Sequence, residues 1–160
     1  MRGLTLARLI ALIAPAALLG GALLSEYVGG LAPCEMCYWQ RWPHAVAIGF
    51  ALFAILFRGT GARFFLLLAA LAIATSGAIG IFHAGVEYGW WEGLTACSTT
   101  GMAGSTQDVL DNIMATPLVR CDVPQWTLLG ISLAGFNAIL SLGAAAAILI
   151  LTTGRKGRQA

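Results

Sequence analysis

Four long stretches without a charged side chain divide this sequence, at residues 9–25, 42–57, 64–86 and 123–154. A helix that crosses a bilayer needs roughly 17–25 predominantly apolar residues, so the last two stretches are long enough and the first two lie near the lower limit. Arg8 and Arg58 border the two shorter stretches, and an arginine side chain can extend from a helix end to the lipid headgroups. The pattern predicts four membrane-spanning helices.

The composition excludes an ordinary water-soluble domain. The 160-residue chain is 59% hydrophobic and only 10% charged, whereas soluble domains carry about 25% charged residues. The apolar content is also far too high for a disordered protein. Nine basic against seven acidic residues give a net charge of +2, without the basic cluster that nucleic-acid binding requires. We therefore expect an integral membrane protein that binds no nucleic acid.

The length favours a single domain. We expect one all-α membrane domain over residues 1–160, an antiparallel bundle of four transmembrane helices at about 9–25, 42–57, 64–86 and 124–152. Two outer loops, at about 26–41 and 87–123, connect them at one end. In the longer loop, residues 105–108 resemble a capping box, and apolar residues then recur at helical spacing as far as Pro117. This pattern predicts a short helix in the membrane interface.

The distribution of charge predicts the orientation. By the positive-inside rule, both termini are cytoplasmic and the two loops face outward. All seven acidic residues lie in those two loops. The basic residues on the cytoplasmic side are Arg2, Arg8, Arg58, Arg63, Arg155, Lys156 and Arg158.

A signal peptide in the first 25 residues is an alternative to the first span, because basic residues precede an apolar run and small residues follow at 20–22.

All four cysteines, Cys34, Cys37, Cys97 and Cys121, lie in the two outer loops. None fills the interior of a predicted helix, although free cysteine is a common buried residue. An even number of cysteines on the outer side indicates an oxidising compartment. Structural disulfides, a zinc site and a pair of redox centres are the alternatives, and a single Cys-x-x-Cys motif in that compartment disfavours zinc.

The Cys34-Glu35-Met36-Cys37 spacing favours redox chemistry. A disulfide within Cys-x-x-Cys closes so few residues that it restricts the unfolded chain little. We expect the second helix to begin close after Cys37, so that its sulfur lies near the positive end of the helix dipole. Arg41 follows four positions later, and both positive charges favour the Cys37 thiolate. We interpret Arg41 as orienting an oxygen-bearing ligand such as a quinone carbonyl. The alternative is an ordinary arginine that extends to the membrane interface without contacting a ligand.

These residues resemble those of a known family. The segment CEMCYWQR, from Cys34 to Arg41, resembles the first outer loop of the DsbB family of quinone-dependent, disulfide-forming proteins of the bacterial inner membrane. The segment CDVPQW, which begins at Cys121, is similar to the family's second loop. The resemblance covers all four predicted spans, both loops and all four cysteines. Cys-x-x-Cys alone is a weak signal, but its combination with this topology and with Arg41 is specific.

The resemblance implies a relay between thiols and a membrane quinone. A reduced DsbA-type thioredoxin-fold partner would attack a Cys97–Cys121 disulfide and form a mixed disulfide with Cys97. Cys121 would then attack Cys34 and release Cys37 as a thiolate, which agrees with the helix-dipole argument. Cys37 would pass the electrons to ubiquinone or menaquinone, with Arg41 beside the quinone ring.

The two histidines are weaker candidates. His83 lies near the outer end of the third predicted helix, where members of the family carry a histidine beside the quinone; a hydrogen-bonded polar residue inside the bundle is the alternative. No family role maps onto His44.

Three other functions remain open at this point. Ligation of a haem by His44 and His83 would make the chain a small cytochrome b. A structural or transport protein with four spans and stapled loops is a second possibility, although no acidic residue lies within a predicted span to relay protons. A vitamin K epoxide reductase-like protein has four helices and two cysteine pairs as well, and in that class the substrate and the direction of electron flow can differ.

Overall fold

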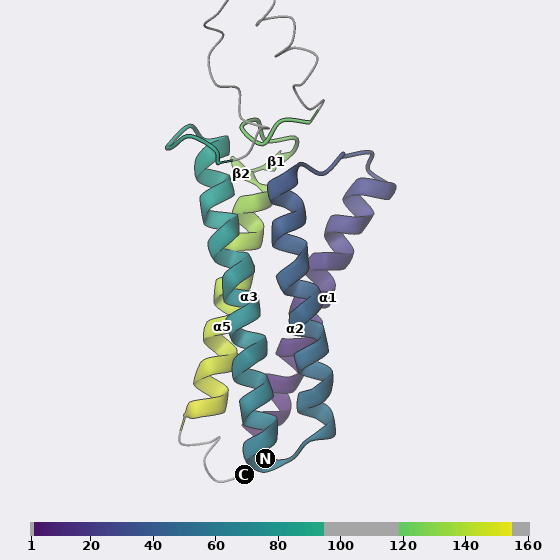
Figure 1. Cartoon of the computed structure of the whole chain (residues 1–160), viewed down its shortest axis with the longest axis vertical. Helices are drawn as coiled ribbons and strands as arrows, with labels where there is room; N and C mark the ends of the chain where they lie inside the picture. The colour runs from purple at the N-terminus through teal and green to yellow at the C-terminus, as the bar shows by residue number, and fades with distance from the viewer. Residues whose placement is uncertain (1, 95–118, 155–160) are drawn as a thin grey trace, which may run out of the picture.

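The computed structural model describes residues 2–94 and 119–154. In this part of the chain, four long helices, α1 (Arg2–Tyr27), α2 (Glu35–Leu56), α3 (Gly59–Glu87) and α5 (Leu133–Thr153), form an antiparallel bundle (Figure 1). A small hairpin of β1 (Thr127–Leu128) and β2 (Ile131–Ser132) precedes α5. Cys97 and the short helix expected at 105–117 lie outside the described residues. Apart from this hairpin, every described element is a helix, as predicted.

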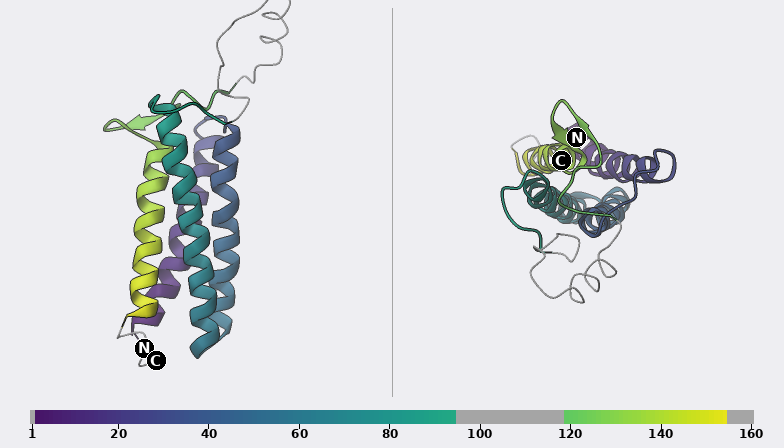
Figure 2. Two further views of the ribbon diagram at one scale, coloured as in Figure 1. Left: turned by 60° about the vertical axis from the view of Figure 1, so that its left-hand side comes forward. Right: turned by 90° about the horizontal axis from the view of Figure 1, so that it is seen from above.

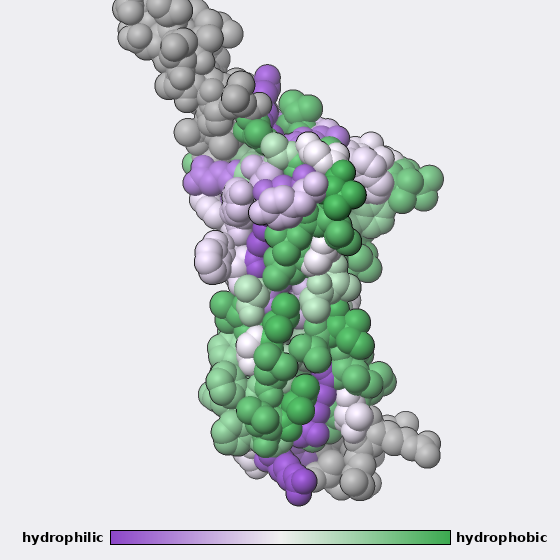
Figure 3. All heavy atoms as spheres, turned by 90° about the vertical axis from the view of Figure 1, so that its right-hand side faces the viewer, coloured by the Kyte–Doolittle hydropathy of each residue, from purple (hydrophilic) through white to green (hydrophobic). Residues whose placement is uncertain are grey.

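Three of the described helices are long and apolar enough to cross a membrane: Gly3–Tyr27, Gly59–Glu87 and Leu133–Thr153. The expected fourth span, α2, is not among them, since Glu35, Gln40, Arg41 and His44 make its first half polar. On the face drawn in Figure 3, hydrophobic side chains cover most of the length of the bundle, whereas hydrophilic ones gather toward its two ends. This surface is suited to a lipid environment.

Several helix boundaries differ from those expected. α1 and α2 begin at Arg2 and Glu35, before the predicted starts at about 9 and 42. The reason is that a charged residue ends an apolar stretch but does not end a helix. α5 begins at Leu133 rather than near 124, after Ser132, whose Oγ accepts the Gly135 N–H at 3.1 Å as an N-cap.

A two-residue hairpin occupies the segment where the start of the last helix was expected. β1 pairs antiparallel with β2, and Leu128 lies opposite Ile131. The turn residues Leu129 and Gly130 both have positive φ, 53° and 79°, as the turn of a tight two-residue hairpin requires. Because three of the four residues at 128–131 are apolar, the hydropathy pattern does not distinguish this turn from the helix that follows.

Small residues allow the helices to approach closely. A Cβ on Gly77 of α3 would lie 2.9 Å from Leu142 of α5, and a Cβ on Gly80 would lie 3.0 Å from the Ala134 carbonyl. Such glycines are common where membrane helices pack. Viewed from above, the four helices surround a common axis (Figure 2). Toward the loop end α1 diverges from α2 (Figure 1), and the functional candidates lie at this end.

Candidate functional site

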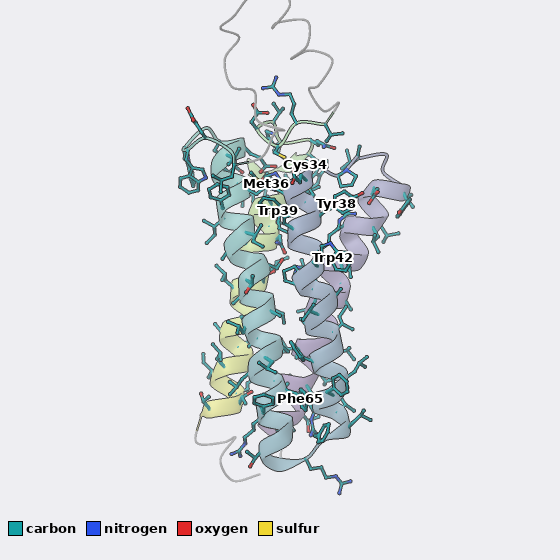
Figure 4. The ribbon with its side chains drawn as sticks, in the orientation of Figure 1. Cys34, Met36, Tyr38, Trp39, Trp42 and Phe65 are labelled. Carbon is teal, nitrogen blue, oxygen red and sulfur yellow. The ribbon has the colours of Figure 1, made fainter. Side chains whose placement is uncertain are left out.

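The Cys-x-x-Cys pair forms the N-terminal turn of α2. Cys34 is the N-cap, and its Sγ accepts the backbone N–H of Cys37 at 3.4 Å. An N-cap commonly bonds to the amide three residues later, so the motif has the spacing of a helix cap. Both residues are thiols here, with their Sγ atoms 3.1 Å apart. Figure 4 shows Cys34 at the loop end of α2, remote from Phe65 at the opposite end of the bundle.

The two thiols differ in acidity. Hydrogen bonding to Cys34 lowers the pKa of Cys37, and the positive charge of Arg41 adds a smaller lowering, against the opposing effect of burial. The same hydrogen bond, together with burial, raises the pKa of Cys34. Cys37 is therefore the more acidic thiol of the pair, and it loses its proton before Cys34 does. This direction agrees with the sequence-based expectation, but the main cause is the partner thiol rather than Arg41.

His83 of α3 lies directly beside the pair. Its Nε2 is 3.5 Å from Cys34 Sγ and 3.7 Å from Oε1 of Glu87, one turn along α3. Its Nδ1 is 2.8 Å from the side-chain nitrogen of Gln40 on α2. Both His83 and Glu87 are buried. The sequence singled out His83 as a neighbour of the quinone, and the structure places it beside the thiol of Cys34.

The hydrogen bonds of Gln40 define the tautomer of His83. The Gln40 Nε2 donates to the Met36 carbonyl at 3.2 Å, and the Gln40 Oε1 accepts from Nδ2 of Asn137 at 2.8 Å. With the amide oriented in this way, Gln40 donates to Nδ1 of His83, and the neutral ring carries its proton on Nε2. That N–H lies next to the sulfur of Cys34.

Three ligand-type side chains meet at this point. Cys34, Cys37 and His83 offer a sulfur or nitrogen atom each, all within 4.8 Å of one another, which is a grouping that could hold a metal ion. A metal would need an unprotonated Nε2 on His83, but the hydrogen bond from Gln40 places the proton on that atom. The arrangement therefore fits thiol chemistry better than metal binding.

Cys121 of the second loop joins the same site. It is fully buried and packs with Cys34, Met36 and Val86 in one apolar cluster. The structure thus brings together three of the four predicted redox cysteines, at the junction of the two loops with α2 and α3. The predicted partner of Cys121, Cys97, lies outside the described residues.

Hydrogen bonds hold the second loop over the first. Nε2 of Gln125 donates to the Ala32 carbonyl at 2.6 Å, just ahead of Pro33 and the cysteine motif. The hydroxyl of Tyr88 donates to the Gly130 carbonyl at 2.9 Å, which ties the hairpin to the end of α3. These contacts bring Cys121 to the N-terminus of α2, and no pattern in the sequence predicts them.

A cavity of about 270 Å³ lies beside the cysteine pair at the diverging end of α1. Small side chains of α1, such as Gly21 and Ala22, leave space on one side, and the other helices contribute polar groups. The polar residues of α2, α3 and α5 that line it include Cys37, Arg41, His44, His83, Glu87 and Asn137. The cavity therefore offers apolar walls with a few polar groups, as small-molecule sites commonly do.

Arg41 lines this cavity from within α2 rather than from the loop in which it was expected. Its Nη1 forms an ion pair with Glu26 of α1, its Nη2 donates to the Ala22 carbonyl at 3.2 Å, and its guanidinium lies 5.1 Å from the centre of the Tyr38 ring. In the described structure its Nε is buried and has no hydrogen-bond partner. These contacts hold the guanidinium in place, and the Nε–H group is the one without a partner.

Sequence reasoning missed the place of His44. The ring is buried, with Nε2 2.9 Å from both Asn137 Oδ1 and Ser76 Oγ, and it lines the cavity. A signal for this was present: Cys37, Arg41 and His44 follow one another at intervals of four and three residues, which places them on one face of a helix. The expected start of the helix beyond Cys37 concealed that face.

Comparison with known proteins agrees with this geometry. The family model "Disulfide bond formation protein DsbB" matches residues 5–151. "Uncharacterized protein RP370" of Rickettsia prowazekii (strain Madrid E) is 27% identical over 78% of this chain and 73% of its own length. No solved structure matches the chain. Since the family match spans nearly the whole chain, including both cysteine loops and all four helices, the protein belongs to the DsbB family and is a disulfide-forming membrane oxidoreductase.

Proposed function

We propose that this protein reoxidises a periplasmic DsbA-type thioredoxin-fold protein and passes the electrons to a membrane quinone. The observation that carries the proposal is the position of Cys37. Its pKa is lowered by the hydrogen bond with Cys34, and its side chain lines a cavity that Arg41 also lines. A thiolate beside an apolar cavity with a buried N–H donor fits electron transfer to a flat, oxygen-bearing ring.

The proposed relay begins at the second loop. The partner's thiolate attacks the Cys97–Cys121 disulfide at Cys97, and Cys121 leaves as a thiolate. Cys121 then attacks Cys34 of the first-loop disulfide, and Cys37 leaves as a thiolate. The partner's second thiol resolves its mixed disulfide and releases Cys97 as a thiolate. Cys97 then attacks Cys121 of the Cys34–Cys121 disulfide, which restores the Cys97–Cys121 disulfide and leaves Cys34 and Cys37 both reduced. Burial of Cys121 against Cys34 in one cluster supports the exchange between the pairs.

The quinone, ubiquinone or menaquinone, would supply a two-electron acceptor, taking up two electrons and two protons as the dithiol of Cys34 and Cys37 becomes a disulfide. Arg41 fits this ligand because its unpartnered, buried Nε–H can donate to a carbonyl oxygen, while Glu26 and Tyr38 hold the guanidinium. His83 also lines the cavity, and its Nε2–H beside Cys34 can donate to that sulfur and stabilise the Cys34 thiolate that forms during exchange.

The proposed setting is the bacterial inner membrane, with a single four-span domain, both termini in the cytoplasm and the cysteine loops in the periplasm. Two observations support this orientation. Most basic residues lie in the predicted cytoplasmic segments, and the start of α1 and the end of α5 lie at the end of the bundle opposite the cysteines (Figure 1). α2 would be the fourth span, with its polar first half facing the cavity.

The decisive experiment combines the purified protein, a reduced DsbA-type partner and either ubiquinone or menaquinone. We expect loss of partner thiols, measured with a thiol reagent, in step with loss of quinone absorbance. Separate replacements of the four cysteines by alanine should each abolish coupled turnover. If Cys37→Ala retains quinone reduction, the relay as drawn is wrong. If the wild-type protein oxidises the partner without consuming either quinone, the proposed electron acceptor is wrong.

A further inference from the structure

One buried nitrogen at the cavity has no role in the relay. Nδ1 of His44 has no hydrogen-bond partner within the described structure, although the ring is only 3% exposed and lines the cavity. A buried polar atom without a partner loses its hydration without compensation. Because His44 is one of the residues that line the cavity, the missing partner is explained most simply by a ligand that supplies it.

The hydrogen bonds of Asn137 determine what kind of partner this is. Nδ2 of Asn137 donates to Gln40 Oε1 at 2.8 Å and to the Ser76 carbonyl at 3.2 Å, so its Oδ1 is the atom 2.9 Å from Nε2 of His44. That oxygen can only accept, and it also accepts from the Ser141 hydroxyl. His44 must therefore donate through Nε2.

Ser76 leads to the same assignment. Its hydroxyl donates to the Gln40 carbonyl at 2.8 Å, so toward His44 its oxygen is an acceptor. With Nε2 as the donor, the neutral ring of His44 has a bare lone pair on Nδ1. The unpartnered atom of His44 is thus a hydrogen-bond acceptor, whereas the unpartnered atom of Arg41 is a donor.

We propose that His44 binds the reduced form of the quinone selectively, by accepting a hydrogen bond from a quinol hydroxyl at Nδ1. A quinone has only carbonyl acceptors, which gain nothing from a second acceptor, whereas a quinol has two hydroxyl donors. Arg41 can donate to an oxygen of either form. This inference rests on the proposed function. It means that His44 increases the driving force of the reaction.

The consequence is thermodynamic. Electrons leave the dithiol of Cys34 and Cys37, which becomes a disulfide, and the two thiol protons balance the two that the quinone takes up. Tighter binding of the quinol than of the quinone favours this direction. A tenfold preference raises the midpoint potential of the bound two-electron couple by about 30 mV. His44 would therefore make the bound quinone a stronger oxidant of Cys37.

Two substitutions separate this role from a structural one. In His44→Gln the amide nitrogen can occupy the place of Nε2 and keep the bonds to Asn137 and Ser76, but no atom remains at Nδ1. In His44→Asn the shorter amide can place an oxygen near Nδ1, but it does not reach Asn137 or Ser76. A purely structural role therefore predicts damage in His44→Asn alone, and the quinol role predicts it in His44→Gln.

The test measures the dissociation constants of both redox forms of a short-chain ubiquinone, and of menadione and menadiol in a second arm, by quenching of tryptophan fluorescence. We expect His44→Gln to weaken quinol binding about tenfold and quinone binding little, with thermal unfolding and Cys37 alkylation unchanged. His44→Asn should retain part of the preference. Equal affinities in His44→Gln and wild type, or equal weakening of both forms, would overturn the inference while leaving the proposed function intact. If the wild-type protein binds neither form of either compound, the quinone part of the proposed function fails with it.

Discussion

The backbone N–H of Cys37 donates to the sulfur of Cys34 at 3.4 Å, so the redox pair and the N-terminal cap of α2 are one structure. This relationship explains why the two thiols differ in acidity. Cys34 is the less acidic thiol and is buried beside Cys121 and His83, whereas Cys37 lies one turn into the helix and is partly exposed. Both cysteines line the cavity, so the pair lies between the second-loop cysteine and the cavity.

The first prediction concerns the reactivity of the reduced pair. Because the pKa of Cys37 is lowered and that of Cys34 is raised, Cys37 becomes a thiolate at a pH below the ordinary thiol midpoint of about 8.5. Alkylation by iodoacetamide, followed by peptide mass spectrometry as the pH is raised, should therefore modify Cys37 first. Cys34→Ala should move the Cys37 midpoint upward, while Cys34→Ser, which keeps a hydroxyl donor, should move it less. Earlier modification of Cys34 would contradict the assignment.

The second prediction concerns Arg41. Arg41→Ala removes the buried N–H at the cavity, so the quinone concentration at half-maximal rate should rise about tenfold, as expected for the loss of a charge-assisted hydrogen bond. Glu26→Gln keeps the guanidinium but weakens its ion pair, and a smaller rise is expected. Steady-state turnover against quinone concentration measures both effects. An unchanged requirement in Arg41→Ala would refute contact between Arg41 and the quinone.

The third prediction concerns communication between the loops. Gln125→Ala removes the hydrogen bond to the Ala32 carbonyl, which holds the second loop over the cysteine motif. The disulfide exchange in which Cys121 attacks Cys34 should slow several-fold in rapid-quench experiments with the reduced partner. Thr127→Ala, an exposed position nearby in β1, serves as the control. Equal exchange rates in the two variants would show that the hydrogen bond between Gln125 and Ala32 does not affect the exchange.

The fourth prediction concerns the packing behind the site. A Cβ on Gly85 would lie 2.1 Å from Cζ2 of Trp91, whose ring stacks on Phe82. Gly85→Ala must displace the indole and should destabilise the protein by about 1–3 kcal/mol. Gly143→Ala in α5 meets no atom within 4 Å and should be neutral or stabilising, because alanine favours helix. Thermal unfolding in detergent compares them, and equal midpoints would contradict the packing argument.

Much of the fold could be predicted because the chain contains few charges. Apolar stretches indicate helices regardless of their neighbours, and the bundle follows from their number and short connections. The boundaries were less predictable. Arg41 marks the end of an apolar stretch in the sequence, yet it lies inside α2, because a charged residue does not end a helix. Its charge is paired with Glu26 of α1. The turn at Leu129 and Gly130 was missed because its residues are largely apolar.

The sequence by itself determined that this is an α-helical, apolar chain with a Cys-x-x-Cys pair, since hydropathy and local spacing are properties of neighbouring residues. Only the tertiary structure decided which side chains meet the pair. Cys121 lies beside Cys34, although 87 positions separate them in the chain. Asn137 fixes the tautomer of His44 from a distant helix. Such contacts depend on how helices pack and loops fold back, and packing brings together residues that no local pattern relates.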